Sequence, residues 1–291
     1  MPKKRVIAAI LVKGGWTVQS LGFSRYLPVG RPEIAARFFS SWGADEILLI
    51  DIDASQEDRT IDLDLVERVA AQVFVPLTVG GGIRTPGHVR DIVQAGADKV
   101  AINLAAFRQP EEIRAAAEVF GNQCIVGAMD ARRGGDGSHR VFMNVASEET
   151  GQSAAHYAHR LAELDVGEIL VQSIDNDGAR QGYDLALLDT VGDAVSCPII
   201  ALGGAGHPAH LLQALSRDHV SAAAAANYFH YTEHAIAAAK SYLHGAGLDV
   251  RLDTRADYRL HKFSETDGRI LKRPGEELAD EVYEFLPEEV I

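Results

Sequence analysis

Cysteine is scarce in this sequence: its 291 residues include two, Cys124 and Cys197. Both lie in apolar, strand-like runs, so we interpret them as buried free thiols in a reducing compartment, and a disulfide framework is excluded. No apolar run approaches the ~18 residues of a membrane span, and the basic N-terminus leads into a strand-like segment without a signal-peptide pattern. We therefore expect no membrane span, no secretion signal and a cytoplasmic location.

The chain has fewer basic than acidic residues, and its histidines do not form a metal-ligand pattern. The chain has 28 Lys and Arg against 41 Asp and Glu, a net charge of −13, which argues against non-specific nucleic-acid binding. Two histidine pairs, His207 with His210 and His230 with His234, lack cysteine or acidic companions at ligand spacing, so solvated or packed histidines are the favoured interpretation. The sequence thus predicts no metal site and no cofactor.

The chain does contain a regular alternation of short apolar runs and amphipathic segments. Near-continuous apolar runs are typical of parallel strands covered by helices. The expected strands are residues 5–11, 46–51, 75–79, 99–103, 124–130, 168–173, 198–202 and 221–226, and the expected helices are 32–42, 63–71, 88–94, 110–119, 154–164, 184–191, 208–216 and 232–243. This alternation predicts an α/β fold, a (β/α)8 TIM barrel over residues 1–249. A doubly wound sheet is disfavoured, because no G-x-G-x-x-G fingerprint follows the first strand.

An internal repeat supports the barrel. Gly81 is separated from Gly203 by the same number of residues as Asp51 from Ser173, and the members of each pair follow equivalent strands. This register predicts two half-barrels built from one duplicated unit. The alternative is chance similarity between glycine-rich loops.

Residues 250–291 stand outside the barrel as a charged C-terminal extension. From Gly275 to Glu289 it contains seven acids and no base. We expect a partly ordered appendage on the barrel surface, and a tail that docks a partner is the alternative.

Polar groups at the ends of the expected strands are the candidates for chemistry, because parallel barrels carry their active sites there. Asp51, Asp130 and Asp177 belong to this mouth, where converging carboxylates raise one another's pKa and prepare proton transfer. A structural role is the alternative for each of them. The glycine loops after the third and seventh strands suit a substrate with a phosphate at each end, or are plain tight turns.

The motifs of the barrel resemble those of one enzyme family. Over residues 3 to about 250 the chain is similar to the cyclase subunit of imidazole glycerol phosphate synthase. The matching stretches include Asp51-Ile52-Asp53-Ala54-Ser55, Val79-Gly80-Gly81-Gly82-Ile83, Ser173-Ile174-Asp175-Asn176-Asp177-Gly178 and Gly203-Gly204-Ala205-Gly206. The resemblance implies a barrel that takes ammonia from a glutaminase docked at its N-terminal face. The ammonia passes through the barrel core to a phosphorylated substrate at the C-terminal face.

The resemblance also assigns residues at the N-terminal face. The family closes this end with a gate of alternating charges, which Arg5, Glu46, Lys99 and Glu168 match, each at the start of an expected strand. A salt-bridge ring that merely plugs the barrel is the alternative. Asp98 matches a residue that contacts the glutaminase.

Substrate positions of the family are retained in part. Gly82, Asn103, Gly178 and Gly204 match positions that bind the substrate. The family uses two aspartates as acid and base; Asp130 is one, and the other position holds Leu11. The chain departs from the family at further substrate positions. Gln19 stands where the family has a lysine, Leu104 where it has a threonine, and Leu202 and Asn227 where it has serines. Since leucine exchanges no proton, we expect the cyclase reaction to be slower by on the order of 10²–10⁴.

This combination resembles a diverged branch of the family, associated with amidine (acetamidino) modification of surface-polysaccharide sugars. That branch likewise has an apolar residue at the first-strand position and a first loop comparable to residues 23–32. We predict an ammonia-channelling subunit that pairs with a glutaminase as a heterodimer and serves nitrogen transfer to an activated sugar or related small molecule. Two alternatives stay open: a genuine cyclase, a lyase of histidine biosynthesis, and a non-catalytic scaffold barrel.

Overall fold

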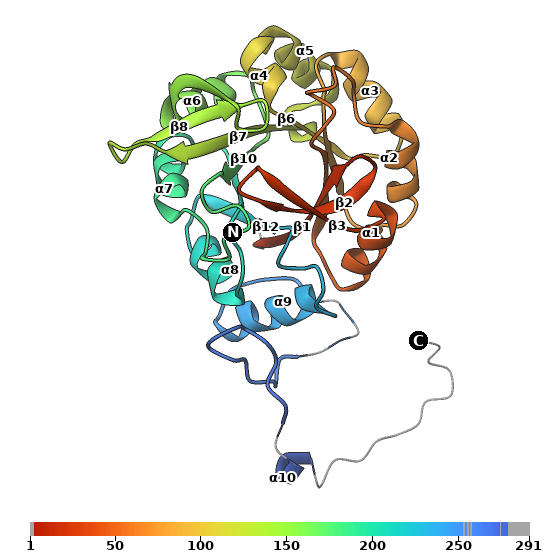
Figure 1. The fold of residues 1–291 in the computed structure, drawn as a ribbon, viewed down its shortest axis with the longest axis vertical. Coiled ribbons are helices and arrows are strands. Elements are labelled where there is room, and N and C mark those ends of the chain that lie inside the picture. Colours follow the sequence, from red (N-terminus) through yellow and green to blue (C-terminus); the bar gives the residue numbers. More distant parts are fainter. Residues whose placement is uncertain (1–2, 253, 255, 257, 274, 279–291) are drawn as a thin grey trace.

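The computed structural model describes residues 3–252, 254, 256, 258–273 and 275–278. Parallel strands close into a barrel that is surrounded by helices (Figure 1). The barrel strands are β1 (Arg5–Lys13), β4 (Glu46–Asp51), β5 (Leu77–Gly80), β6 (Lys99–Ile102), β7 (Ile125–Arg133), β10 (Glu168–Ser173), β11 (Ile199–Leu202) and β12 (Val220–Ala225). β12 pairs with β1 and β10 pairs with β7, so the ring is closed. The predicted (β/α)8 fold is confirmed.

The helices begin where the sequence supplies a start signal. Proline occupies the first turn of α1, α3, α5 and α8, where its missing N–H is not needed. Asp62, Thr85 and Ser153 cap α2, α3 and α6 by accepting a backbone hydrogen bond. The helices are α1 (Pro32–Ser41), α2 (Leu63–Ala70), α3 (Pro86–Gln94), α4 (Leu104–Arg108), α5 (Pro110–Phe120), η1 (Asn122–Cys124), α6 (Ala154–Glu163), α7 (Leu185–Ala194), α8 (Pro208–Leu215), α9 (Ala235–Gly245) and α10 (Gly275–Leu278).

The predicted element bounds agree with these to within a few residues. The largest shifts are of three residues: β7 and α7 end at Arg133 and Ala194 rather than at 130 and 191, and α9 begins at Ala235 rather than at 232. His234 before α9 takes a left-handed conformation with φ of 54°. Within the described ranges, no helix has the length and apolar character needed to cross a membrane.

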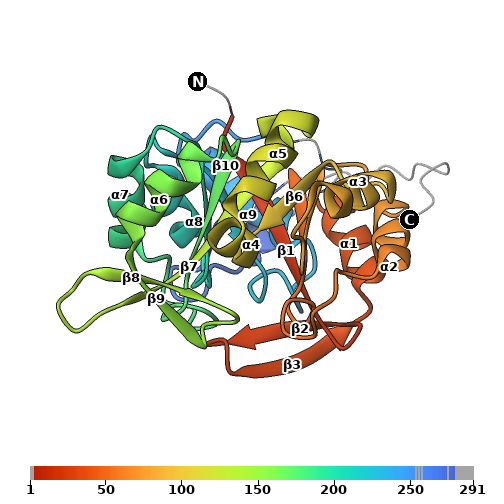
Figure 2. The ribbon, with the colours of Figure 1, turned by 90° about the horizontal axis from the view of Figure 1, so that it is seen from above.

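Two β-hairpins at the C-terminal end of the barrel were not among the expected strands. β1 turns at Gly14-Gly15 into β2 (Trp16–Leu21), which pairs with β3 (Arg25–Gly30). β7 likewise continues into β8 (His139–Met143) and β9 (Glu148–Ser153). Figure 2 shows β2 and β3 lying across the end of the barrel that is opposite the N-terminus. The expected set of strands was therefore incomplete at the mouth of the barrel.

The barrel has an outer and an inner hydrophobic core. The outer core lies between strands and helices, and the inner one fills the barrel with side chains from alternate strand positions, such as Ile7 and Ala9 of β1. Alanines contribute much of the inner core: Ala9, Ala101, Ala128, Ala222 and Ala224. The other buried residues of the inner core are larger: Ile7, Leu48, Val126, Leu170, Ile200 and Leu202.

Within the described part of the extension, the segment around Phe263 and Ser264 packs beside α8 and α9, whereas α10 lies away from them (Figure 1). Arg251 Nε donates to Asp45 Oδ1 at 3.1 Å. The ring of Phe263 contacts that of Tyr242 in α9, with centroids 5.5 Å apart. Most of the predicted acidic end, residues 279–291, lies outside the described residues.

Candidate functional site

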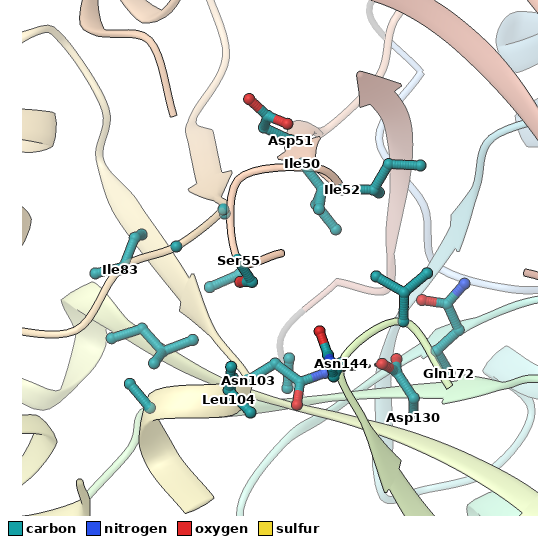
Figure 3. A pocket seen from close by; sticks show the side chains of 18 of the residues that line it. Ile50, Asp51, Ile52, Ser55, Ile83, Asn103, Leu104, Asp130, Asn144 and Gln172 are labelled. Atoms are coloured by element: carbon teal, nitrogen blue, oxygen red, sulfur yellow. Dashed lines mark hydrogen bonds between the residues drawn. The ribbon is translucent and has the colours of Figure 1, made fainter. Parts of the chain in front are cut away.

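A cavity of about 270 Å³ opens at the C-terminal ends of β4, β5, β6 and β7. Figure 3 shows apolar Ile50 and Ile52 on one side of it, and Asn103, Asp130, Asn144 and Gln172 gathered on the other. The β2–β3 hairpin contributes further lining residues. These are Ser20, Phe23 and Tyr26. The cavity thus lies at the predicted end of the barrel.

Asp130 is a buried carboxyl group of this cavity. It accepts a hydrogen bond from Asn103 Nδ2 at 2.8 Å. Burial raises the pKa of Asp130 to about 7, against the opposing hydrogen bond from Asn103 and with a smaller contribution from the charge of Asp177. A carboxyl group with this pKa releases and takes up protons near neutral pH, which general acid–base catalysis requires.

The raised pKa of Asp130 predicts a pH-dependent stability. The folded state keeps this proton up to about pH 7, whereas the unfolded chain releases it near pH 4. As the pH rises from about 4 to 7, the wild type should therefore lose stability relative to Asp130→Asn, by on the order of 3–4 kcal/mol, and above pH 7 the difference should stay constant. Urea denaturation of both proteins across this range measures it. A difference that does not change with pH would contradict the raised pKa.

Asn103 lines the cavity next to Asp130, and the two ends of its carboxamide differ in their hydrogen bonding. The carboxamide nitrogen Nδ2 donates a hydrogen bond to Asp130. The carboxamide oxygen Oδ1 is buried and has no hydrogen-bond partner among the described residues. A donor on a bound molecule would satisfy this oxygen. Leu104, which follows, presents an apolar side chain to the same cavity.

Asp51 and Leu11 also line the cavity, in different ways. Figure 3 shows Asp51 on the far side of the cavity from Asp130. Its carboxylate accepts a hydrogen bond from Arg59 Nη1 at 2.6 Å and one from the Ala54 N–H at 3.2 Å. These bonds anchor the loop that follows β4. Leu11 presents an apolar side chain at the end of β1.

Asp177 lies beside the cavity rather than in its lining, and it holds the β2–β3 hairpin. Its carboxylate accepts hydrogen bonds from Ser20 Oγ at 2.5 Å and from the Phe23 N–H at 3.2 Å. Its carbonyl oxygen accepts from the Gly22 N–H at 3.0 Å. Burial raises the pKa of Asp177, although these bonds to the carboxylate oppose the rise. Gly178 lies under the same turn, against the Ser20 carbonyl.

Backbone packing accounts for the glycines of the two repeated loops. Gly82 has a φ of 64° and Gly204 a φ of 100°, both in the left-handed region. A Cβ at Gly82 would overlap the carbonyl oxygen of Arg59, and one at Gly204 would overlap that of Gly182. The tight-turn interpretation therefore explains both glycines. Of the two, Gly82 lines the cavity.

At the opposite end of the barrel the four predicted gate residues meet, and we call them the charge ring. Arg5 Nη1 donates to Glu46 at 2.9 Å, and Arg5 Nη2 pairs with Glu168. Lys99 Nζ bridges the two glutamates, at 3.1 Å from Glu46 and 2.8 Å from Glu168. Burial alone would raise the pKa of Glu168, but Arg5 and Lys99 outweigh it and lower the pKa, so Glu168 is ionised.

The surface around the charge ring is partly hollow. A groove of about 490 Å³ begins at Lys99 and Glu168 and extends over Gln123 and Cys197. Asp98, beside Lys99, is exposed on this face. Both cysteines are free, and burial raises the pKa of Cys197 to about 11, so it is a protonated thiol.

Sequence reasoning missed the parts of the site that the hairpins supply. Ser20, Phe23 and Tyr26 come from the β2–β3 hairpin, and Asn144 with Val145 from the turn between β8 and β9. The glycines at the first turn of each hairpin were the available signal. In the described part of the chain, no group of three His, Cys, Asp or Glu side chains is arranged to hold a metal ion.

The chain matches a known protein family and is similar to a protein of known name. A family model described as "Histidine biosynthesis protein" matches residues 5–235. The imidazole glycerol phosphate synthase subunit HisF of Streptococcus sanguinis (strain SK36) is 42% identical over 252 residues, which span 87% of this chain and all of the relative. The family match includes the charge ring, the cavity and the hairpins.

Proposed function

Because the chain belongs to the family of histidine biosynthesis proteins, we propose that it is the barrel subunit of a glutamine-dependent synthase and receives ammonia from a glutaminase. The observation that carries this proposal is that the two ends of the same barrel have different polar groups. A charge ring closes the N-terminal end, and a carboxyl group that titrates near neutral pH lies at the other end. The similar HisF protein is itself named as a subunit, which supports an assembly of two chains.

The route that we propose for ammonia runs along the barrel axis. The glutaminase docks on the N-terminal face, over the charge ring and its groove, where exposed Asp98 contacts it. Ammonia is small and neutral and passes the charge ring when Lys99 moves aside. The route toward Asp130 passes the inner core, in which small alanine side chains lie among larger apolar ones.

Reconstitution with a glutaminase from the same organism tests the route. We expect the barrel to stimulate glutamine hydrolysis, and we expect Lys99→Ala and Arg5→Ala to alter ammonia transfer because they open the charge ring. Lys262→Ala, at an exposed position in the extension, is the matched control. Unaltered transfer in both ring variants would favour a structural ring. No stimulation by any glutaminase of that organism would reject the proposal.

For the acceptor, we propose an activated sugar of a surface polysaccharide that becomes an amidine. Leu11, at the first-strand position, lines the same cavity as Asp130 and offers no group for proton exchange. The resemblance to the amidine-modifying branch, which also has an apolar residue there, supports this choice. Asp130 then handles the proton of the reaction alone.

The cyclase of histidine biosynthesis is the second candidate, and the 42% identity over the whole length of HisF favours it. Complementation decides between the two. We expect an auxotroph that lacks its cyclase subunit not to grow without histidine when it expresses this chain with its glutaminase. The HisF protein of the same comparison, expressed with its own glutaminase, is the positive control. Growth with this chain would establish the cyclase and reject the interpretation of Leu11.

A further inference from the structure

Side-chain hydrogen bonds hold the β2–β3 hairpin over one side of the barrel mouth. Asn227, just after β12, donates from Nδ2 to the Ser20 carbonyl at 2.6 Å and accepts from the Ser20 N–H at Oδ1, at 3.2 Å. One carboxamide thus satisfies both backbone groups of Ser20, as a neighbouring strand would. Asp177, after β10, holds the next turn through Ser20 Oγ and the Phe23 N–H.

The cavity occupies the side that the hairpin leaves open. Its lining comes from the ends of β4 to β7, from Gln172 of β10 and from the hairpin itself. Of the described residues, none at the ends of β11 and β12 lines it: Leu202 belongs to the inner core, and Asn227 is bonded to Ser20. The volume of about 270 Å³ is just below the roughly 300–1,000 Å³ of sites for drug-sized ligands.

We infer that Asn227 is a specificity-determining residue: it latches the hairpin over the β10–β12 half of the mouth, so that the site takes a compact acceptor and excludes an extended molecule with a phosphate at each end. This inference rests on the proposed function, since it concerns the acceptor of the same site. Residues 20–23 are held against the ends of β10 and β12 by Asp177 and Asn227, so a molecule that extends beyond the cavity on this side would meet them. A serine in place of Asn227 has a shorter side chain with one polar atom in place of the separate Nδ2 and Oδ1, so it does not reproduce the two bonds to Ser20.

We expect the hairpin to form without the two bonds of Asn227, because its strand pairings do not involve Asn227. Val18 of β2 remains paired with Leu11 of β1, and Gln19 remains paired with Leu27 of β3. The two bonds of Asn227 fix where the hairpin lies rather than whether it forms. Asn227→Ser is therefore a usable variant.

Amide hydrogen exchange tests the latch. In Asn227→Ser we expect the Ser20 and Phe23 amides to exchange faster than in the wild type by on the order of tenfold, because about two hydrogen bonds are lost or weakened. The matched control is Asn122→Ser, whose side chain bonds Asp165 at the other end of the barrel, and it should leave these rates unchanged. Equal rates for Ser20 in the wild type and in Asn227→Ser would overturn the latch.

Binding of two probes tests the consequence. Glucose 6-phosphate carries one phosphate and fructose 1,6-bisphosphate carries one at each end. By calorimetry we expect the wild type to show no preference for the bisphosphate, and Asn227→Ser to bind the bisphosphate at least about tenfold more tightly than the wild type does. A wild-type preference for the bisphosphate, or no gain in Asn227→Ser, would overturn the specificity role. Neither experiment uses the glutaminase, so the failure of this inference and the failure of the ammonia route are seen separately.

Discussion

Replacement of Glu46 by alanine is expected to lower the free energy of unfolding by about 3 kcal/mol. Glu46 is 2% exposed and accepts hydrogen bonds from Arg5 at 2.9 Å, Lys99 at 3.1 Å and Thr78 at 2.5 Å. Its removal leaves two half-buried cations to share Glu168 alone, and an incompletely paired buried charge is costly. Urea denaturation of the isolated chain at neutral pH measures the change.

A surface glutamate provides the matched control for this prediction. Glu111 pairs with Arg114 on the same helix at 3.5 Å, and its side chain is 80% exposed. Exposed pairs of this kind contribute little, so Glu111→Ala should change the unfolding free energy by no more than about 0.5 kcal/mol. If Glu46→Ala were as stable as Glu111→Ala, the charge ring would not contribute to the stability of the barrel.

The barrel itself could be predicted because its strands are buried on both faces. Such strands are nearly continuous apolar runs, and the helices between them carry one apolar stripe, so the two patterns are easily told apart. The resemblance to the cyclase family grouped Arg5, Glu46, Lys99 and Glu168, and their positions in the chain agree with that grouping. Each begins a strand, and in a closed parallel barrel the starts of all strands lie at one end.

The hairpins had a sequence signal that the strand assignment did not use. Gly14 and Gly15 lie between Lys13 and Trp16 with φ of 55° and 81°, and two adjacent glycines between strand-like residues favour a two-residue hairpin turn. Gly134, in the turn before β8, belongs to a similar glycine-rich stretch. Apolar periodicity alone missed both hairpins because no residue of β3 or β9 is buried.

The position of the first hairpin over the mouth could not have been predicted locally. It depends on contacts between Ser20 and Asn227, which are 207 residues apart in the chain. For the same reason Asp177, placed by its strand-end position among the acid–base candidates, was not expected to hold a hairpin. Strand-end position brings a carboxylate to the mouth, and its hydrogen-bond partners then decide what it can do there.

Asp130→Asn is expected to slow nitrogen transfer to the acceptor by on the order of 10²–10⁴-fold while leaving stimulation of the glutaminase unchanged. The carboxamide of this variant keeps the shape of the side chain but neither releases nor takes up the proton, and the charge ring at the other end of the barrel is untouched. The measurement is the incorporation of ¹⁵N from the glutamine amide into the acceptor. Asp136→Asn, on the exposed turn after β7, is the matched control and should keep full activity.

The pH dependence of the same reaction shows whether one carboxyl group or an acid–base pair handles the proton. Leu11 supplies no second titrating group, and burial raises the pKa of Asp130 to about 7. The rate of transfer should therefore follow one ionisation near pH 7, where two catalytic groups would give a bell-shaped profile. A bell-shaped profile that persists in Asp130→Asn would show that other groups carry the proton, and the assignment of Asp130 would then be wrong.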